Sequence, residues 1–292
     1  MSKEVFIGTA TALVTPFKDD GIDFETFGKI VDFQIENGID ALVVCGTTGE
    51  ASTMPDEEHL DAIRFVVEKT AKRVPVIAGT GSNDTKHAIY LSKKAQELGA
   101  DAILSVTPYY NKTTQSGLYE HFRMIANSID IPMILYNVPS RTGLNIDAKT
   151  VQSLSKIENI VGLKECNLAQ APHIIGNVRD DFAVYSGNDP EVLQLLAIGG
   201  KGLISVASNV IPKDVSTMVR KWLRQDIIAA RELYYKILPF AEALFIEVNP
   251  VPVKKAMSFI GFDCGKCRMP LTDMLPANED KLAAAARNYG LI

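Results

Sequence analysis

The amino-acid sequence predicts an α/β protein, a (β/α)8 barrel with a C-terminal helical extension. Short apolar, β-rich runs alternate with amphipathic segments, and there are eight such runs, the number that closes a β/α barrel. The runs are almost uniformly apolar, which is typical of parallel strands buried on both faces. The predicted strands cover residues 8–14, 41–44, 76–78, 102–106, 133–136, 160–164, 183–185 and 203–206.

Between the predicted strands, apolar residues recur at three- and four-residue spacing, which indicates amphipathic helices. Residues 57–67 form one such segment, and residues 85–98 form another that Gly99 closes. We expect the barrel to cover residues 1–224. Residues 225–292 are enough for a helical region of three helices.

An open doubly wound sheet is the alternative architecture. That fold favours a Gly-rich dinucleotide-binding turn after its first strand. Here Thr15-Pro16-Phe17 follows the first strand. Gly79-Thr80-Gly81, after the third strand, continues to Asp84 where the motif requires another glycine. The sequence therefore favours the barrel.

The composition is that of an ordinary globular protein, with 47% hydrophobic and 22% charged residues among 292. The net charge of −5, without a basic tract, argues against nucleic acid as a partner. No apolar stretch reaches the length of a membrane span. Met1-Ser2-Lys3-Glu4 carries an acidic residue where a signal peptide is basic, so we expect a cytoplasmic protein.

Signals for metal binding are weak. Cys264 and Cys267 have C-x-x-C spacing, but no second pair of ligands follows, and the motif follows a loop-like stretch rather than a strand. We interpret it as incidental. The histidines show no pair at ligand spacing, so we expect no metal. They are His59, His87, His121 and His173.

Lys164 is the most informative single residue. It ends the apolar run 160–163, where burying an ammonium group is costly. Burial also lowers the pKa of the amine, and a neutral amine can attack a carbonyl group to form a Schiff base. The alternative is a lysine that extends to water along its aliphatic stem.

Polar residues follow the predicted strands at their carboxyl ends, where barrel enzymes place catalytic groups. They offer an amine for a ketone, phenols for proton transfer and donors for carboxylates. The segments are Gly46-Thr47-Thr48-Gly49-Glu50, Thr107-Pro108-Tyr109-Tyr110-Asn111, Tyr136-Asn137-Val138-Pro139-Ser140-Arg141-Thr142-Gly143, Lys164-Glu165, Ser186-Gly187-Asn188-Asp189 and Ala207-Ser208-Asn209.

Each segment also has a structural interpretation. Thr47 and Thr48 can form a tight turn and helix cap, although the same turn offers backbone N–H groups to a carboxylate. Tyr109 and Tyr110 can be half-buried aromatic residues. Arg141 can be a solvated loop charge instead of a carboxylate ligand.

Over essentially its whole length the sequence resembles the pyruvate-dependent class I aldolase superfamily typified by N-acetylneuraminate lyase. Within it, the sequence is most similar to the dihydrodipicolinate synthase (4-hydroxy-tetrahydrodipicolinate synthase) family. The resemblance rests on Gly46-x-x-Gly49-Glu50, Thr47-Thr48, Tyr109-Tyr110-Asn111, the strand-end lysine and the octet from Tyr136 to Gly143.

The resemblance implies a carbon–oxygen lyase that condenses pyruvate with L-aspartate 4-semialdehyde to 4-hydroxy-tetrahydrodipicolinate, in lysine and diaminopimelate biosynthesis. It implies a Schiff base on Lys164 and no cofactor besides it. Tyr136 matches the phenol that assists proton transfers at the imine. Thr48 and Tyr110 match its partners in a proton relay to solvent.

Four further positions match substrate contacts of that family. Thr47 matches a residue that contacts the pyruvate carboxylate. Arg141 matches the residue that binds the carboxylate of aspartate semialdehyde, and Gly187 and Ile204 match backbone positions that line the pocket.

Oligomerisation and regulation follow from the same resemblance. Family members are commonly homotetramers built as dimers of dimers, some are dimers, and Tyr110 matches a tyrosine that reaches the neighbouring subunit's site. In lysine-inhibited members, lysine binds at a subunit interface with a glutamate where this chain has His87 and a histidine where it has Asp56. An imidazole cannot replace a carboxylate as the partner of a cationic amine, so we expect weak or absent inhibition by lysine. The positions of this degenerate site are Ala51, Ser52, Asp56, His59, Asn83, His87 and Tyr109.

Two other functions stay open. A sialic-acid or sugar-acid lyase of the superfamily shares the lysine and the Gly-x-x-Gly-Glu motif, but typically lacks the second threonine and the arginine loop. A non-catalytic protein that binds pyruvate-like ligands does not need the phenols of Tyr136 and Tyr110.

Overall fold

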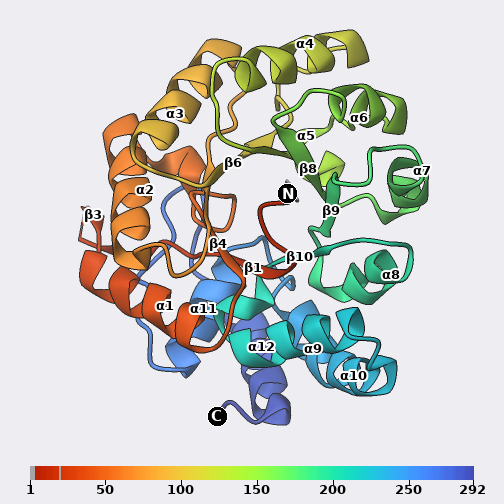
Figure 1. Ribbon diagram of the computed structural model, residues 1–292. Helices are drawn as coiled ribbons and strands as arrows, with labels where there is room; N and C mark the ends of the chain where they lie inside the picture. The colour runs from red at the N-terminus through yellow and green to blue at the C-terminus, as the bar shows by residue number, and fades with distance from the viewer. Residues whose placement is uncertain (1–3, 20) are drawn as a thin grey trace.

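The computed structural model describes residues 4–19 and 21–292, and its centre is a closed barrel of parallel strands surrounded by helices (Figure 1). The strands follow one another in the order β1-β10-β9-β8-β7-β6-β5-β4, which confirms the predicted fold. They are β1 (Gly8–Ala12), β4 (Ala41–Val44), β5 (Val76–Gly79), β6 (Ala102–Val106), β7 (Met133–Asn137), β8 (Ile160–Glu165), β9 (Ala183–Ser186) and β10 (Gly202–Ser205).

The predicted strands agree with these bounds to within two residues at each end. The largest difference is in β1, which ends at Ala12 and not at residue 14. The cause is local, because the backbone N–H of Val14 donates to the Asn209 side chain instead of to a neighbouring strand. A short hairpin of β2 (Phe17–Lys18) and β3 (Gly21–Ile22) lies outside the barrel, and it was not predicted.

Helices connect the strands and form the outer ring (Figure 1). The side chain of Asp84 caps one of them by accepting from the backbone N–H of Lys86, which explains an aspartate where a dinucleotide-binding turn has glycine. The ring comprises α1 (Phe24–Glu36), α2 (Asp56–Thr70), α3 (Thr85–Glu97), α4 (Gln115–Ala126), α5 (Pro139–Thr142), α6 (Ala148–Leu154), α7 (Ala171–Ile175), α8 (Val192–Ala197) and α9 (Pro212–Leu223). Short 3-10 turns are η1 (Ala51–Thr53), η2 (Leu168–Gln170), η3 (Asp189–Glu191) and η4 (Ala207–Asn209).

The C-terminal extension consists of α10 (Ile227–Ala243), α11 (Val251–Phe259) and α12 (Pro276–Tyr289). Helix α10 packs against α9 of the barrel and against α12, while α11 packs against α12 (Figure 1). The predicted C-terminal helices are therefore present. The division into two domains at residue 224 stays a prediction.

Two apolar layers hold the barrel together. One fills its interior with inward side chains such as Ala10, Ile77, Ile134 and Ile204. The other lies between strands and helices and contains Leu42, Phe27 and Ile63 among many others. Alternate residues of each strand thus face opposite layers, so both faces of the sheet are buried. Within the described ranges, every helix is too short or too polar to cross a bilayer.

Candidate active site

Lys164 lies inside the carboxyl end of the barrel. Lys164 is 6% exposed, and its Nζ lies 4.3 Å from the centre of the Tyr136 ring. The two residues are partners in the register of β7 and β8, so both side chains project to the same face. Burial lowers the pKa of the Lys164 amine, and the nearby Cys166 and Asp189 partly oppose this effect. Burial thus shifts this amine toward its neutral form, which is the nucleophilic form.

Tyr136 is buried beside this amine. Burial raises the pKa of its phenol well above the usual value, so the proton stays on the oxygen at neutral pH. A side-chain hydrogen bond from Thr47 lowers the pKa of Tyr136 and opposes the effect of burial. Tyr136 also interacts with the Cys166 thiol. The phenol therefore has a hydroxyl partner in the turn after β4.

The two neighbouring threonines have different surroundings from those that the family resemblance implies. The hydroxyl that lowers the pKa of Tyr136 belongs to Thr47, and Thr47 and Tyr136 line the same cavity. Thr48 is buried, and its Oγ1 accepts a hydrogen bond of 3.0 Å from Asn249 Nδ2 in the C-terminal region. Successive residues of a turn point in different directions, which the sequence pair alone does not resolve.

Gly187 and Cys166 pack directly against Lys164. A Cβ atom at Gly187 would lie 2.2 Å from Cys166 Sγ and 3.2 Å from Lys164 Cε. Glycine is therefore required by this close approach, and its role in lining a substrate pocket stays a prediction. Ile204 lies in the same interior cluster as Tyr136, and its role in lining the pocket stays a prediction.

A cavity of about 370 Å³ opens beside Tyr136, although Lys164, Gly187 and Ile204 are not part of its lining. Its lining includes Thr47, Tyr136 and Arg141 from the predicted substrate site. It also includes most positions of the degenerate lysine site, namely Ala51, Ser52, Asp56, His59, His87 and Tyr109. A larger cavity of about 790 Å³ lies at the other end of the barrel, beside residues that precede strands, and contains no predicted site residue.

Arg141 comes from the short helix α5 and is exposed at the mouth of the barrel. One of its Nη atoms lies 3.5 Å from the backbone oxygen of Asn249. The guanidinium group therefore borders the cavity with most of its donors available, as the predicted role in binding a carboxylate requires.

In the degenerate lysine site, His87 and Asp56 bind each other. His87 Nε2 lies 2.9 Å from Asp56 Oδ1, and His87 Nδ1 lies 3.2 Å from Ser82 Oγ. His59 is buried, with Nε2 at 2.8 Å from the backbone oxygen of Gly79, and burial lowers its pKa. Asn83 donates from Nδ2 to the backbone oxygen of Tyr109. The acidic side chain of this site is thus already paired within the chain.

Tyr110 is the predicted site residue that the single chain leaves apart. It is 93% exposed, and its backbone is in the left-handed region with a φ of 70°. Such a conformation is uncommon for a tyrosine, and the ring makes little contact with its own chain. The structure of one chain does not bring Tyr110 to Tyr136.

Several residues near the site have roles that sequence reasoning did not assign. Cys166 and Asp189 lie near Lys164. Asp189 belongs to a predicted strand-end segment, and Cys166 directly follows another. Glu165 follows Lys164 on the outer face of β8, where Asn137 donates to it at 2.8 Å. No sequence pattern indicated a role for Asn249, because its partner Thr48 lies 201 residues away in the chain.

No cluster of three or more potential metal ligands exists among residues 4–19 and 21–292. Cys264 and Cys267 are free thiols, and burial raises the pKa of each to about 12.

Comparison with known proteins identifies the family. The model of the dihydrodipicolinate synthetase family matches residues 5–288. The 4-hydroxy-tetrahydrodipicolinate synthase of Acetivibrio thermocellus is 57% identical over 292 residues, all of both chains. The crystal structure of dihydrodipicolinate synthase from Aquifex aeolicus has a TM-score of 0.96 at 46% identity, over 98% of this chain and 99% of that one.

A third relative carries a ligand. It is the dihydrodipicolinate synthase of Acinetobacter baumannii complexed with pyruvate, with a TM-score of 0.95 at 42% identity over 98% of this chain and 99% of the other.

The fold defines the class, a (β/α)8 barrel, and this one has a buried lysine at the carboxyl end of β8. The full-length matches narrow this class to one family. The chain belongs to the dihydrodipicolinate synthetase family and is a lyase.

Proposed function

We propose that this enzyme condenses pyruvate with L-aspartate 4-semialdehyde through a Schiff base on Lys164, and that the product is 4-hydroxy-tetrahydrodipicolinate. The observation that carries the proposal is the buried amine of Lys164 with its lowered pKa, 4.3 Å from the Tyr136 ring. The names of the relatives and the pyruvate complex of one of them support the same substrates. This reaction belongs to lysine and diaminopimelate biosynthesis.

The chemistry begins with attack of the neutral Lys164 Nζ on C2 of pyruvate. The ketone oxygen leaves as water, and the protonated imine that results withdraws electrons from C3. C3 then loses a proton, attacks the aldehyde carbon of the second substrate and forms the new carbon–carbon bond. The amino group of that substrate adds to C2, and Lys164 leaves as the free amine. The protein supplies proton transfer and carboxylate binding, and no further cofactor enters the scheme.

In this proposal the two threonines exchange the roles that the family resemblance suggested. Thr47 joins Tyr136 in proton transfer, because its hydroxyl interacts with the phenol. The turn from Gly46 to Glu50 binds the pyruvate carboxylate through its backbone. Among the described residues, the N–H groups of Thr47 and Thr48 donate no hydrogen bond, so both are available to an anion.

The proposed oligomer is a homotetramer built as a dimer of dimers. Its support is Tyr110, which is 93% exposed in the single chain although it matches a relay residue. An exposed tyrosine at the mouth of a barrel fits a place in the site of a second copy.

Reductive trapping tests the proposal. The protein is treated with pyruvate and borohydride, weighed intact and then mapped by peptide. We expect one reduced pyruvate adduct on Lys164 and none in Lys164→Ala, whose folding is checked by circular dichroism. In a coupled assay, turnover should require aspartate semialdehyde. Adduct formation on another lysine, or turnover of an amino sugar instead, contradicts the proposal.

A further inference from the structure

The turn that carries Thr47 and Thr48 is hydrogen-bonded to the C-terminal region. Three contacts connect them, although the partners are more than 200 residues apart in the sequence. They join Asn249 to Thr48, Lys254 to Glu50, and the backbone of Arg268 to Glu50.

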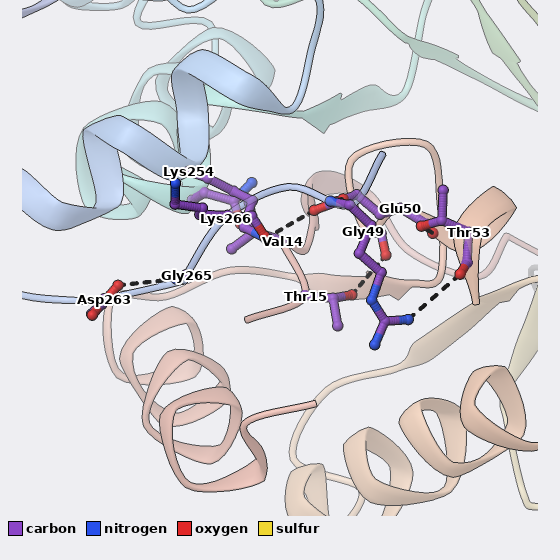
Figure 2. Close-up of polar contacts among 11 residues, drawn as sticks. Val14, Thr15, Gly49, Glu50, Thr53, Lys254, Asp263, Gly265 and Lys266 are labelled. Atoms are coloured by element: carbon purple, nitrogen blue, oxygen red, sulfur yellow. Dashed lines mark hydrogen bonds and ion pairs between the residues drawn. The ribbon is translucent and has the colours of Figure 1, made fainter. Parts of the chain in front are cut away.

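Glu50 is the centre of the first group of contacts (Figure 2). Its carboxylate accepts from Lys254 Nζ at 2.9 Å and from the backbone N–H of Arg268 at 2.8 Å, so both oxygens are occupied. The side chains of this ion pair are 3% and 1% exposed. Removing one partner of a buried pair leaves the other charge uncompensated, so each is needed while the other is present.

The backbone of Glu50 explains why this anchor matters for the turn. Its φ is 56°, in the left-handed region that a glutamate rarely adopts. The adjacent Gly49 is fixed as well, because its backbone oxygen accepts from Thr15 Oγ1 at 2.8 Å (Figure 2). The C-terminal residues thus hold a conformation that local preference disfavours.

Asn249 is the second link, and it touches two substrate positions at once. Its Nδ2 donates to Thr48 Oγ1 at 3.0 Å, and its backbone oxygen lies 3.5 Å from an Nη atom of Arg141. The residue is 5% exposed, and its Oδ1 has no hydrogen-bond partner among the described residues. A buried acceptor without a partner is unfavourable for folding, so packing alone does not account for an asparagine here.

We propose that Asn249 and Lys254 are positioning residues that hold the Gly46–Glu50 turn in the geometry that binds the carboxylate of the 2-oxo acid. This inference rests on the proposed function and extends it to the C-terminal region. Asn249 fixes the side chain of Thr48, and Lys254 fixes Glu50 at the end of the turn. The backbone N–H groups of the turn are thereby aimed at the anion before it arrives.

The test measures the pyruvate concentration that half-saturates borohydride trapping on Lys164. In Asn249→Ala and Lys254→Met, this concentration should rise tenfold or more, while the amount of adduct at saturating pyruvate stays close to that of the native enzyme. Lys255→Met is the matched control, because Lys255 is the next residue and pairs with Glu279 at the surface. It should behave as the native enzyme does.

Methyl pyruvate separates carboxylate binding from general damage, because its carboxylate is esterified. Both variants should trap the ester as the native enzyme does, and they should lose only the preference for pyruvate. A lower yield of adduct at saturating pyruvate, with an unchanged half-saturating concentration, shows a purely structural role and overturns the inference. An equal rise of the half-saturating concentration for pyruvate and for methyl pyruvate overturns it as well. If the native enzyme forms no adduct on Lys164, the proposed function fails instead.

Discussion

Gly187 occupies a position that has no room for a larger side chain. A methyl group there would lie 2.2 Å from Cys166 Sγ and 3.2 Å from Lys164 Cε. Gly187→Ala must therefore displace Cys166 Sγ and also shift Lys164 Cε by a few tenths of an ångström. A misplaced nucleophile can lower the rate by up to about a hundredfold. We expect a loss of that size in the rate of reductive trapping with pyruvate, with the fold intact by circular dichroism.

Cys166→Ala supplies the control for this prediction. Alone, Cys166→Ala should trap pyruvate well. Burial raises the pKa of the Cys166 thiol to about 11, so the thiol is neutral at pH 7 and its loss removes no charge from beside Lys164. Combined with Gly187→Ala, Cys166→Ala should restore part of the lost rate, since it removes the Sγ atom. A double variant as slow as Gly187→Ala would show that the thiol is not the obstacle.

Arg141 should act on the second substrate and not on the first. Its guanidinium is at the mouth of the barrel and matches a carboxylate in shape and charge. Arg141→Ala should lower kcat/KM for aspartate semialdehyde about 30-fold, which corresponds to about 2 kcal/mol of transition-state binding. This is the lower end of the range for such charge pairs, because the guanidinium group is exposed. Trapping of pyruvate on Lys164 should stay as in the native enzyme. Equal damage to both steps would assign Arg141 to pyruvate or to the fold.

At the scale of elements, β7 and β8 are joined on both of their faces. Tyr136 and Lys164 are register partners in the barrel, and the next pair in the register is Asn137 and Glu165. Glu165 accepts from Asn137 Nδ2 at 2.8 Å, from the Asn167 backbone at 2.7 Å and from Gln170 Nε2 at 2.8 Å. This outer network fixes the register on which the inner pair depends.

Glu165 also makes a prediction about pH. Burial raises its pKa from 4.5 to about 7, although its hydrogen bonds oppose the shift. Between those pH values the folded chain binds more protons at Glu165 than the unfolded chain does. The protonation of Glu165 therefore stabilises the fold fully below pH 4.5, and this stabilisation is lost as the pH rises through about 7. Its full size is on the order of 3 kcal/mol.

Glu165→Gln should remove that dependence. The measurement is thermal unfolding of the native protein and the variant across this pH window. The difference in stability between them should change with pH in favour of Glu165→Gln as the pH rises. A constant difference would mean that Glu165 does not titrate there. His121, whose pKa burial lowers to about 4, affects both proteins equally and cancels in the comparison.

Helices α2 and α3 decide the expected response to lysine. Asp56 begins α2 and binds His87 of α3 at 2.9 Å, so the acidic group of this site is paired. We expect weak or absent inhibition in a titration of the reaction with L-lysine. The double variant Asp56→His with His87→Glu recreates the pattern of lysine-inhibited relatives and should gain inhibition. Half-inhibition of the native enzyme at submillimolar lysine would contradict the prediction.

At the scale of the whole molecule, the single chain is incomplete if Tyr110 takes part in catalysis. Its side chain is 93% exposed and does not reach the site of its own chain. Tyr110→Phe and Lys164→Ala should each be nearly inactive. When they are mixed under conditions of subunit exchange, hybrid oligomers should regain activity, because one site then contains Lys164 of one chain and Tyr110 of the other.

Two controls complete this experiment. Each variant incubated alone under the same conditions should stay inactive, and light scattering should give the same mass for the hybrids as for the native oligomer. No recovery on mixing would place Tyr110 in the site of its own chain or outside the mechanism. The tetramer and the cytoplasmic location stay predictions.

Much of this protein could be read from local sequence patterns. The eight strands agree with their predictions, because apolar, β-rich runs of four to six residues between helices are typical of a parallel sheet that is buried on both faces. Lys164 could be singled out because a charged group at the end of such a run is costly. The carboxyl ends of the strands then followed from the order of strands and helices alone.

Tertiary structure decided what depends on direction and on distant partners. The sequence pair Thr47-Thr48 does not say which hydroxyl meets Tyr136, since that depends on the path of the turn. Asn249 and Lys254 belong to a region that the pattern describes only as helical, and their partners lie more than 200 residues away. Sequence periodicity reports which face of an element is buried. Only the packed chain reports what that face meets.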